Sequence, residues 1–192
     1  MRKSRIYLAL LHYPMYNKRG EIITTSITNL DLHDISRAAR TYGAEGFFVV
    51  HPSPKQQGLL QDIMGYWQAG YGAQYNPDRE QAFSILKPAL DLLQVMDLIE
   101  KESGCRPSTV ATDAKVHSRT TSYLEMKKKI QEEEQSFLLL FGTGWGISQE
   151  LMQDCDYILE PVQAGSDYNH LSVRSAVSII LDRLLGECWF EA

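Results

Sequence analysis

Residues 136–148 read SFLLLFGTGWGIS, a continuous apolar run followed at once by three glycines in five positions. An apolar run without polar alternation is typical of a strand buried on both faces, as in a parallel sheet covered by helices. The glycines let the backbone approach a ligand closely and leave N–H groups exposed. Their spacing matches neither GxGxxG nor a Gly-Lys-Ser/Thr phosphate loop. Two interpretations stay open: a tight strand-to-helix turn, or a loop that holds a nucleotide-like ligand through its backbone.

On either side of this stretch, expected strands alternate with expected helices. Apolar runs of strand length lie at 5–12, 46–50, 106–112 and 157–159. Helical patterns cover 28–43, 55–70, 122–134 and 173–184. We expect a loop at 69–76 and then a helix that is capped by Asn76, kinked at Pro88 and buried along Phe83, Leu86, Leu90 and Leu93. This alternation predicts an α/β fold, a mostly parallel sheet with helices on both faces, formed by residues 1–192 as a single domain.

Composition excludes several classes of protein. The chain has 192 residues, 44% of them hydrophobic and 22% charged, which is typical of a soluble globular domain and excludes disorder, collagen and disulfide scaffolds. No apolar run approaches the roughly 18 residues of a membrane span, and the N-terminal apolar patch is too short for a signal peptide, so we expect a cytoplasmic protein without membrane contact. Cys105, Cys155 and Cys188 form no CxxC pair, which predicts three buried small side chains and no metal site.

Charge is distributed unevenly along the chain. The net charge is −5, yet residues 1–20 hold five basic residues and no acidic one. Residues 1–58 hold eight basic and four acidic residues, whereas the remainder is acidic. The N-terminal third therefore offers either a basic face to a polyanion such as RNA or a merely solvated surface.

Two other segments carry polar or aromatic groups outside regular elements. Residues 159–176 read LEPVQAGSDYNHLSVRSA, a short strand followed by a polar loop that runs into the last helix. In that loop Asp167 or Ser166 caps a turn, or Asp167 takes a proton from a substrate. The aromatic cluster over 66–75 either stacks on unpaired bases or anchors its own loop.

The two loops and their order resemble the SPOUT superfamily of S-adenosylmethionine-dependent RNA methyltransferases. Residues 141–148 are similar to the glycine loop of those enzymes, and residues 159–176 to their last motif. Residues 31–46 are similar to the first motif of the SpoU-like branch, with Arg37 six residues before Gly43. Asp31 stands where that branch usually has Asn, and Gly144 or Trp145 where Glu is common. The chain looks most like a small bacterial branch grouped with tRNA guanine-N1 methyltransferases.

The resemblance implies a fold, a cofactor and partners. It implies a deep trefoil knot at the C-terminal end, S-adenosylmethionine as cofactor, an RNA substrate (tRNA or rRNA), and a homodimer formed through the knot region and the C-terminal helix. Arg37 would orient an RNA phosphate or the target base, and Asp167 would act as the base. The residues implied in cofactor binding are Leu140, Gly142, Thr143, Gly146, Ile147, Leu159, Pro161, His170, Leu171 and Ser172.

The residues also allow interpretations that do not depend on this resemblance. The apolar stripe of the last helix could pack only within its own domain. His12, His51, Asp113 and His117 are weaker candidates for a pocket rim. A protein of the same fold that binds S-adenosylmethionine or another nucleotide without catalysis, as a regulatory or interaction module, is the alternative function.

Overall fold

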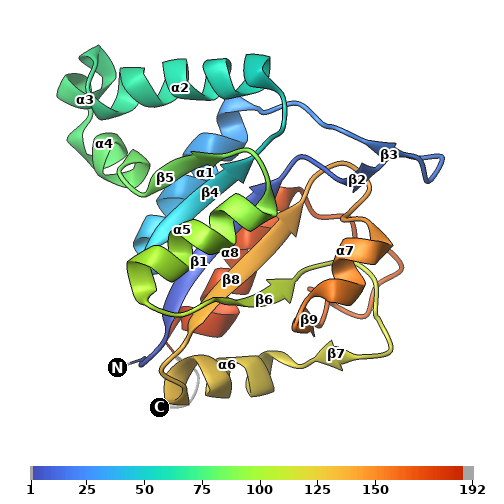
Figure 1. Cartoon of the computed structure of the whole chain (residues 1–192). Coiled ribbons are helices and arrows are strands. Elements are labelled where there is room, and N and C mark those ends of the chain that lie inside the picture. Colours follow the sequence, from blue (N-terminus) through green and yellow to red (C-terminus); the bar gives the residue numbers. More distant parts are fainter. Residues whose placement is uncertain (1, 188–192) are drawn as a thin grey trace.

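A computed structural model describes residues 2–187. Its main sheet has seven strands in the order β5-β4-β1-β8-β6-β9-β7, and all of their pairings are parallel (Figure 1). The strands are β1 Arg5–Leu11, β4 Gly46–Val50, β5 Leu86–Ala89, β6 Ser108–Ala111, β7 Thr120–Thr121, β8 Ser136–Gly142 and β9 Tyr157–Leu159. The expected α/β fold with a parallel sheet is confirmed.

Helices cover both faces of this sheet. They are α1 Asn29–Thr41, α2 Pro54–Gln68, α3 Tyr71–Tyr75, α4 Pro77–Phe83, α5 Leu92–Ser103, α6 Tyr123–Glu132, α7 Gln149–Asp154 and α8 Val173–Leu185. Helices α1 and α8 pack on one face together with α6, and α5 packs on the other with α7. Several helices begin at the residues the sequence marks for that role. Thr28 accepts from the N–H of Asp31 at the start of α1, and Ser122 forms a capping box with Glu125 at the start of α6.

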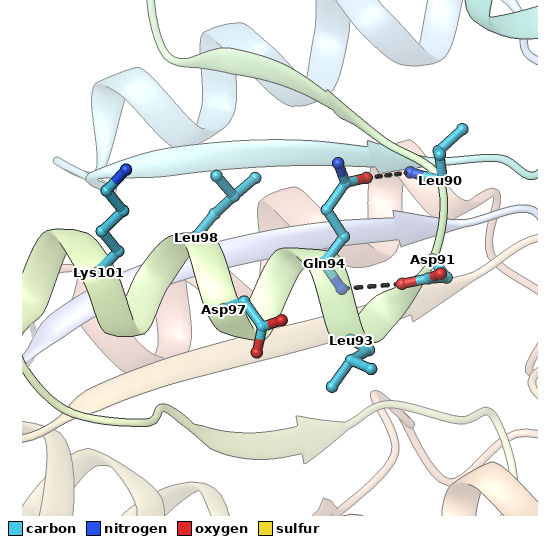
Figure 2. Close-up of a pocket in the computed structure, with 7 residues that line it drawn as sticks. All are labelled: Leu90, Asp91, Leu93, Gln94, Asp97, Leu98 and Lys101. Carbon is cyan, nitrogen blue, oxygen red and sulfur yellow. Dashed lines mark hydrogen bonds between the residues drawn. The ribbon is translucent and has the colours of Figure 1, made fainter.

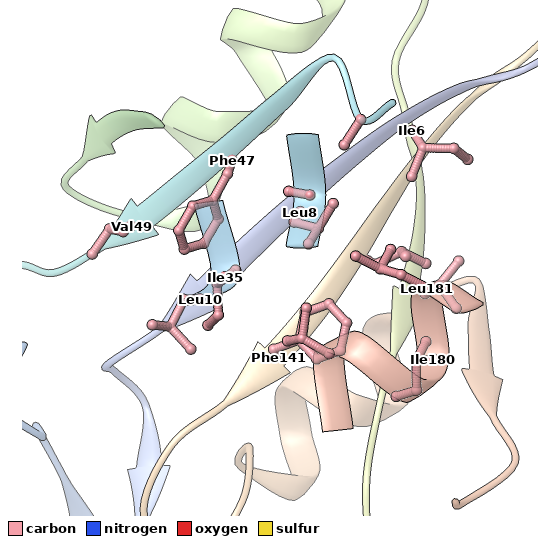
Figure 3. Close-up of a cluster of buried hydrophobic side chains, with 14 of the residues drawn as sticks. Ile6, Leu8, Leu10, Ile35, Phe47, Val49, Phe141, Ile180 and Leu181 are labelled. Atoms are coloured by element: carbon pink, nitrogen blue, oxygen red, sulfur yellow. The ribbon is translucent and has the colours of Figure 1, made fainter. Parts of the chain in front are cut away.

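Strand β1, between β4 and β8, has side chains in both halves of the core. Ile6, Leu8 and Leu10 pack on the side of α1 and α8 (Figure 3). The intervening Tyr7 and Ala9 pack on the side of α5. All five are completely buried. Each large apolar side chain buried in this way contributes about 1.5–3 kcal/mol relative to exposure. The doubly buried strands that the apolar runs predicted are therefore present, and β1 and β8 pair along their whole length.

Residues 69–93 differ from the expectation. A short helix, α3, occupies the expected loop, and Leu86–Ala89 is a strand rather than a helix. Pro88 is accommodated because β5 is the edge strand of the sheet, where a missing N–H breaks no ladder bond on the open side. Leu90 and Leu93 are 51% and 59% exposed, so the predicted buried stripe through them is wrong.

The cysteines divide differently from the prediction. Cys155 is buried, and this burial raises the pKa of its thiol to about 11. Cys105 is exposed, so its predicted burial is wrong. Cys188 lies outside the described residues.

The basic residues of the N-terminus do not form one face. Arg5 begins β1, whereas Lys18 and Arg19 lie beyond its other end, in the turn of a small hairpin formed by β2 Met15–Tyr16 and β3 Ile22–Ile23. This hairpin, which the sequence did not predict, projects past the carboxyl ends of the central strands (Figure 1).

The apolar stripe of α8 is buried within the chain. Val177, Ile180, Leu181 and Leu184 belong to the core on the α1 side of the sheet. The stripe therefore packs against the core of its own chain. Across residues 2–187, no helix has the length and apolar character needed to cross a membrane.

Candidate functional site

The topology marks one place on the sheet as the natural ligand site. From β1 the chain proceeds through β4 to β5 on one side, and later places β8 on the other side of β1. Ligands of parallel sheets bind beyond the carboxyl ends of the strands where the order reverses in this way. Here that point lies between the segment after β1, which begins with His12, and the glycine loop after β8.

A chain of hydrogen bonds spans this point. The hydroxyl of Thr143 donates to the carbonyl of Leu11 at 3.1 Å, so it must accept from the hydroxyl of Thr25. Thr25 Oγ1 in turn accepts from His12 Nδ1 at 2.9 Å. This order leaves the Nε2 atom of His12 unprotonated, and that atom is buried without a hydrogen-bond partner in the described chain. The glycine loop is thus connected to a neutral imidazole with one unused lone pair.

A second imidazole supports the first. His51 follows β4, accepts the N–H of Ser53 through Nδ1 at 3.0 Å and donates from Nε2 to the carbonyl of Thr25 at 3.0 Å. The centroids of the His51 and His12 rings lie 5.6 Å apart. Burial, with a smaller contribution from His51, lowers the pKa of His12 to about 4. Both rings are therefore neutral near pH 7.

The hairpin β2–β3 fixes the glycine loop from the outside. The N–H of Trp145 donates to the carbonyl of Tyr16 at 3.1 Å, and the N–H of Tyr16 donates to the carbonyl of Gly146 at 3.0 Å. The packing explains two glycines, because a Cβ on Gly142 would lie 2.7 Å from Ile147 Cγ1, and one on Gly144 would lie 3.1 Å from the Tyr16 carbonyl. Fewer loop N–H groups are exposed than the sequence predicted. Within residues 2–187, those of Gly144 and Ile147 remain without an acceptor.

Two other loops meet beside the glycine loop. The amide of Asn169, in the loop after β9, donates to the carbonyl of Ala114, in the loop after β6, at 2.9 Å. A Cβ on Gly146 would lie 3.8 Å from Asp113 Oδ1, with no closer neighbour. The other oxygen of Asp113 lies 2.7 Å from His117 Nε2. Free N–H groups, an open approach to a glycine and a nearby carboxylate fit a nucleoside whose ring nitrogens accept and whose hydroxyls donate.

The predicted cofactor residues fall into three groups. Gly142, Thr143, Gly146 and Ile147 lie together in the glycine loop, and Leu159 and Pro161 are buried at the end of β9. His170 and Leu171 are exposed in the loop before α8.

Two further predicted residues already have structural roles. The hydroxyl of Ser172 accepts the N–H of Ser175 and caps α8. The carbonyl of Leu140 accepts both the N–H and the hydroxyl of Thr112.

The two predicted catalytic residues are not joined to the glycine loop by any described contact. Arg37 is exposed on α1, one turn after His33, whose ring packs against Trp67 at 5.0 Å. Asp167 is exposed in the loop after β9 and makes no described hydrogen bond. Asp31, in the first motif, pairs instead with Arg174 of α8 at 3.4 Å.

Sequence reasoning missed Thr25 and the hairpin. His12 and His51 are recognisable in the sequence because each directly follows a buried strand. The sequence indicates no more for either of them than a place at the rim of a pocket. Thr25 carries no such signal, since it lies in an irregular segment and reaches Thr143 across 118 positions of sequence.

Two hollows of the surface lie away from these loops. One, of about 390 Å³, lies along the outer side of α5 and includes Leu90, Leu93 and Leu98 (Figure 2). Another, of about 420 Å³, lies between α5 and the end of α7. Neither includes a predicted site residue, and no group of three metal-ligating side chains gathers among residues 2–187.

Several known proteins are similar to this chain in sequence. A protein from Aquifex aeolicus described as uncharacterized is 44% identical over 186 residues, which cover 97% of this chain and 91% of that protein. A tRNA (guanine-N(1)-)-methyltransferase from Nitratidesulfovibrio vulgaris is 41% identical over 184 residues, which cover 96% of this chain but only 43% of the relative. The chain thus spans less than half of that enzyme.

Solved structures share the fold. The SpoU methyltransferase AviRb from Streptomyces viridochromogenes, in complex with AdoMet, superimposes with a TM-score of 0.57 at 18% identity, over 96% of this chain and 58% of that one. A TrmH/SpoU tRNA modifying enzyme from A. aeolicus gives a TM-score of 0.54 at 16% identity, over 96% and 75% of the two chains. The sequence model of the SAM-dependent RNA methyltransferases matches residues 5–186. The chain therefore belongs to the family of S-adenosylmethionine-dependent RNA methyltransferases.

Proposed function

We propose that this chain transfers a methyl group from S-adenosylmethionine to a tRNA, with the glycine loop as part of the cofactor site. The meeting of the loops after β6, β8 and β9 at the carboxyl edge of the sheet carries the proposal. The tRNA is inferred from the N. vulgaris relative, a tRNA (guanine-N(1)-)-methyltransferase that is more than twice as long as the shared segment.

The cofactor would supply a methyl group already activated by its sulfonium, so the chain has to bind, orient and exclude water. The backbone N–H groups of Gly144 and Ile147 are the free donors for an adenine ring. Gly146 permits close approach of a ligand, and His170 and Leu171, exposed in the loop before α8, are assigned to the same site because the family motifs suggest it.

Methylation of an N–H or O–H group releases a proton, which the chain must accept. We assign this role to Asp167, with Arg37 orienting the RNA, as the family motifs suggest. A second candidate is His117. Its Nε2 lies 2.7 Å from Asp113, which approaches Gly146 of the glycine loop, and donation from Nε2–H to that carboxylate leaves Nδ1 as the basic atom.

The test is methyl transfer from isotopically labelled S-adenosylmethionine to unmodified tRNA, with an rRNA fragment in parallel. Labelled tRNA, with one methylated nucleoside identified by mass spectrometry, is the expected result. Label on rRNA alone would contradict the tRNA assignment, and label on neither would contradict the proposal.

Single substitutions separate the two proton acceptors. Asp167→Ala should abolish turnover and leave cofactor affinity within about threefold, a change of less than 1 kcal/mol. Turnover that survives Asp167→Ala but not His117→Gln would transfer the role to His117. Arg37→Ala should raise the KM for RNA and leave cofactor affinity unchanged.

A second function is favoured by one observation. Neither Arg37 nor Asp167 contacts the glycine loop in the described chain, which favours a cofactor-binding regulatory module without catalysis. Such a protein would bind S-adenosylmethionine and methylate no RNA, and all three substitutions would be silent.

Further proposals concern assembly. We infer a single domain with a C-terminal knot, a homodimer through the knot region and the solvent side of α8, and a cytoplasmic location. The hydrogen bond from Asn169, in the loop after β9, to the carbonyl of Ala114, in the loop after β6, supports the knot because it holds these two loops together. Light scattering at twice the chain mass of 21.8 kDa is the expected result for the dimer.

A further inference from the structure

The glycine loop carries an exposed tryptophan on a fixed backbone. The side chain of Trp145 is 60% exposed, although two hydrogen bonds with Tyr16 hold the backbone on either side of it. Its ring makes no described aromatic or cation–π contact within residues 2–187. A large apolar ring held in solvent next to a ligand site has a cost in free energy that a binding partner can recover.

Unpaired cations lie on the hairpin that holds this loop. Lys18 and Arg19 are exposed in its turn, and their side chains form no ion pair or hydrogen bond among the described residues. The one acidic residue of the hairpin, Glu21, already accepts a hydrogen bond from Asn17 at 2.7 Å. Tyr13, at the base of the hairpin, is 48% exposed. Free cations together with exposed rings match the chemistry of single-stranded nucleic acid, whose bases stack and whose phosphates are anionic.

We propose that Trp145 stacks on an unpaired base of the RNA substrate while Lys18 and Arg19 bind the adjacent phosphates. The inference rests on the proposed function, because it places the RNA at the edge of the sheet where the methyl group would be transferred. The hairpin and the glycine loop share hydrogen bonds through Tyr16, so RNA on one is directly coupled to the position of the other.

The other aromatic cluster is less suited to this role. The rings of Tyr71 and Tyr75 stack on each other with centroids 6.1 Å apart, and Trp67 is covered by the guanidinium of Arg79 at 4.7 Å. These rings already have partners within α2, α3 and α4. Tyr75, which is 75% exposed, is nevertheless a matched control for Trp145 because it is an exposed aromatic on the same protein.

The experiment measures RNA binding of the full chain by fluorescence anisotropy, using unmodified tRNA and a labelled single-stranded oligonucleotide. Trp145→Ala should weaken binding at least about fivefold, as expected for loss of one base stack, and Trp145→Phe should restore part of it. Tyr75→Ala should bind like the wild type. The double variant Lys18→Ala/Arg19→Ala should reduce the slope of log Kd against log salt by about 1–2.

Two results would overturn the inference. One is unchanged RNA affinity in Trp145→Ala, whether or not Tyr75→Ala loses affinity. The other is a change in oligomeric state of Trp145→Ala by light scattering without a change in RNA affinity, which would make this surface a protein interface. Titration with S-adenosylmethionine separates the proposals: weaker RNA binding with intact cofactor affinity supports the inference even if the wild type methylates nothing.

Discussion

The two ends of strand β1 differ in what their polar side chains do. At the amino end, Ser4 donates to the carbonyl of Ile130 at 2.6 Å, Arg2 to that of Tyr42 at 3.1 Å and Arg5 to that of Glu102 at 3.3 Å. These carbonyls lie in the last turns or caps of α6, α1 and α5. The amino end therefore satisfies helix C-termini, where free carbonyls and a partial negative charge favour donors and cations.

At the carboxyl end, the polar groups bond to one another rather than to helix ends. His12, Thr25 and Thr143 form a directed chain, and the chain ends in a buried lone pair on His12. An unsatisfied buried acceptor is costly for stability. One end of the strand is thus built for stability, and the other accepts a cost in stability at the ligand site.

The largest expected effect is the response of the carboxyl end to acid. The unfolded chain protonates His12 near pH 6.5, whereas the folded chain does so only near pH 4. The contribution of neutral His12 to the free energy of unfolding is complete above pH 6.5. About 3 kcal/mol of that free energy is therefore lost as the pH falls to 4. Urea unfolding of His12→Asn between pH 4 and 8 should show a flatter profile than the wild type. Equal slopes would contradict the neutral, buried imidazole. His51 and His33, whose pKa values are also lowered by burial, contribute to the slope that remains in the variant.

The next effect separates crowding from backbone strain. Gly144 and Gly20 both have positive φ, at 61° and 77°, so an alanine at either costs about 1–2 kcal/mol. Only Gly144 is crowded, with the Tyr16 carbonyl 3.1 Å from a Cβ. Gly144→Ala should lose about 1 kcal/mol more than Gly20→Ala in thermal unfolding and at least about tenfold in cofactor affinity, since the loop must shift. Similar losses in both variants would show that the loop is not held tightly against the hairpin.

A smaller effect tests the hydrogen-bond chain itself. Thr143→Val keeps the shape but leaves the hydroxyl proton of Thr25 without an acceptor and the carbonyl of Leu11 without a donor, which should cost about 1–3 kcal/mol. Thr143→Ser, which keeps the hydroxyl, is the matched control and should recover most of that loss. Urea unfolding measures the stability of both variants. Equal stability would contradict the hydrogen bonds described between His12, Thr25 and Thr143.

The smallest effect concerns the amino end. Ser4→Ala removes one hydrogen bond to Ile130 and should lower stability by about 1 kcal/mol while leaving cofactor affinity unchanged. Calorimetric titration together with thermal unfolding checks both parts. A loss of cofactor affinity in this variant would remove the distinction between the two ends.

The sequence predicted most of the sheet because its signals are local. The runs around Leu8, Phe48 and Leu139 are long and uninterrupted, and caps such as Thr28 and Ser122 lie next to the helices they begin. The predicted helix around Pro88 is wrong because a strand can contain this proline only at the edge of a sheet. The edge position of β5 is a property of the whole sheet and not of the local sequence.

The site was less predictable because its contacts join distant segments. The glycine loop was recognisable from its spacing, but the hairpin that covers it belongs to residues 14–25 and has strands of only two residues. The bonds from Thr143 to Thr25 and from Asn169 to Ala114 depend on the completed fold.

The most direct test of the central claim is calorimetric titration of the full chain with S-adenosylmethionine and, separately, with S-adenosylhomocysteine. The carboxyl-edge site predicts binding of each at one site per chain, with dissociation constants of about 1–100 μM, that is about 5 to 8 kcal/mol. No binding of either compound to a chain that unfolds cooperatively would contradict the assignment of the glycine loop as the cofactor site.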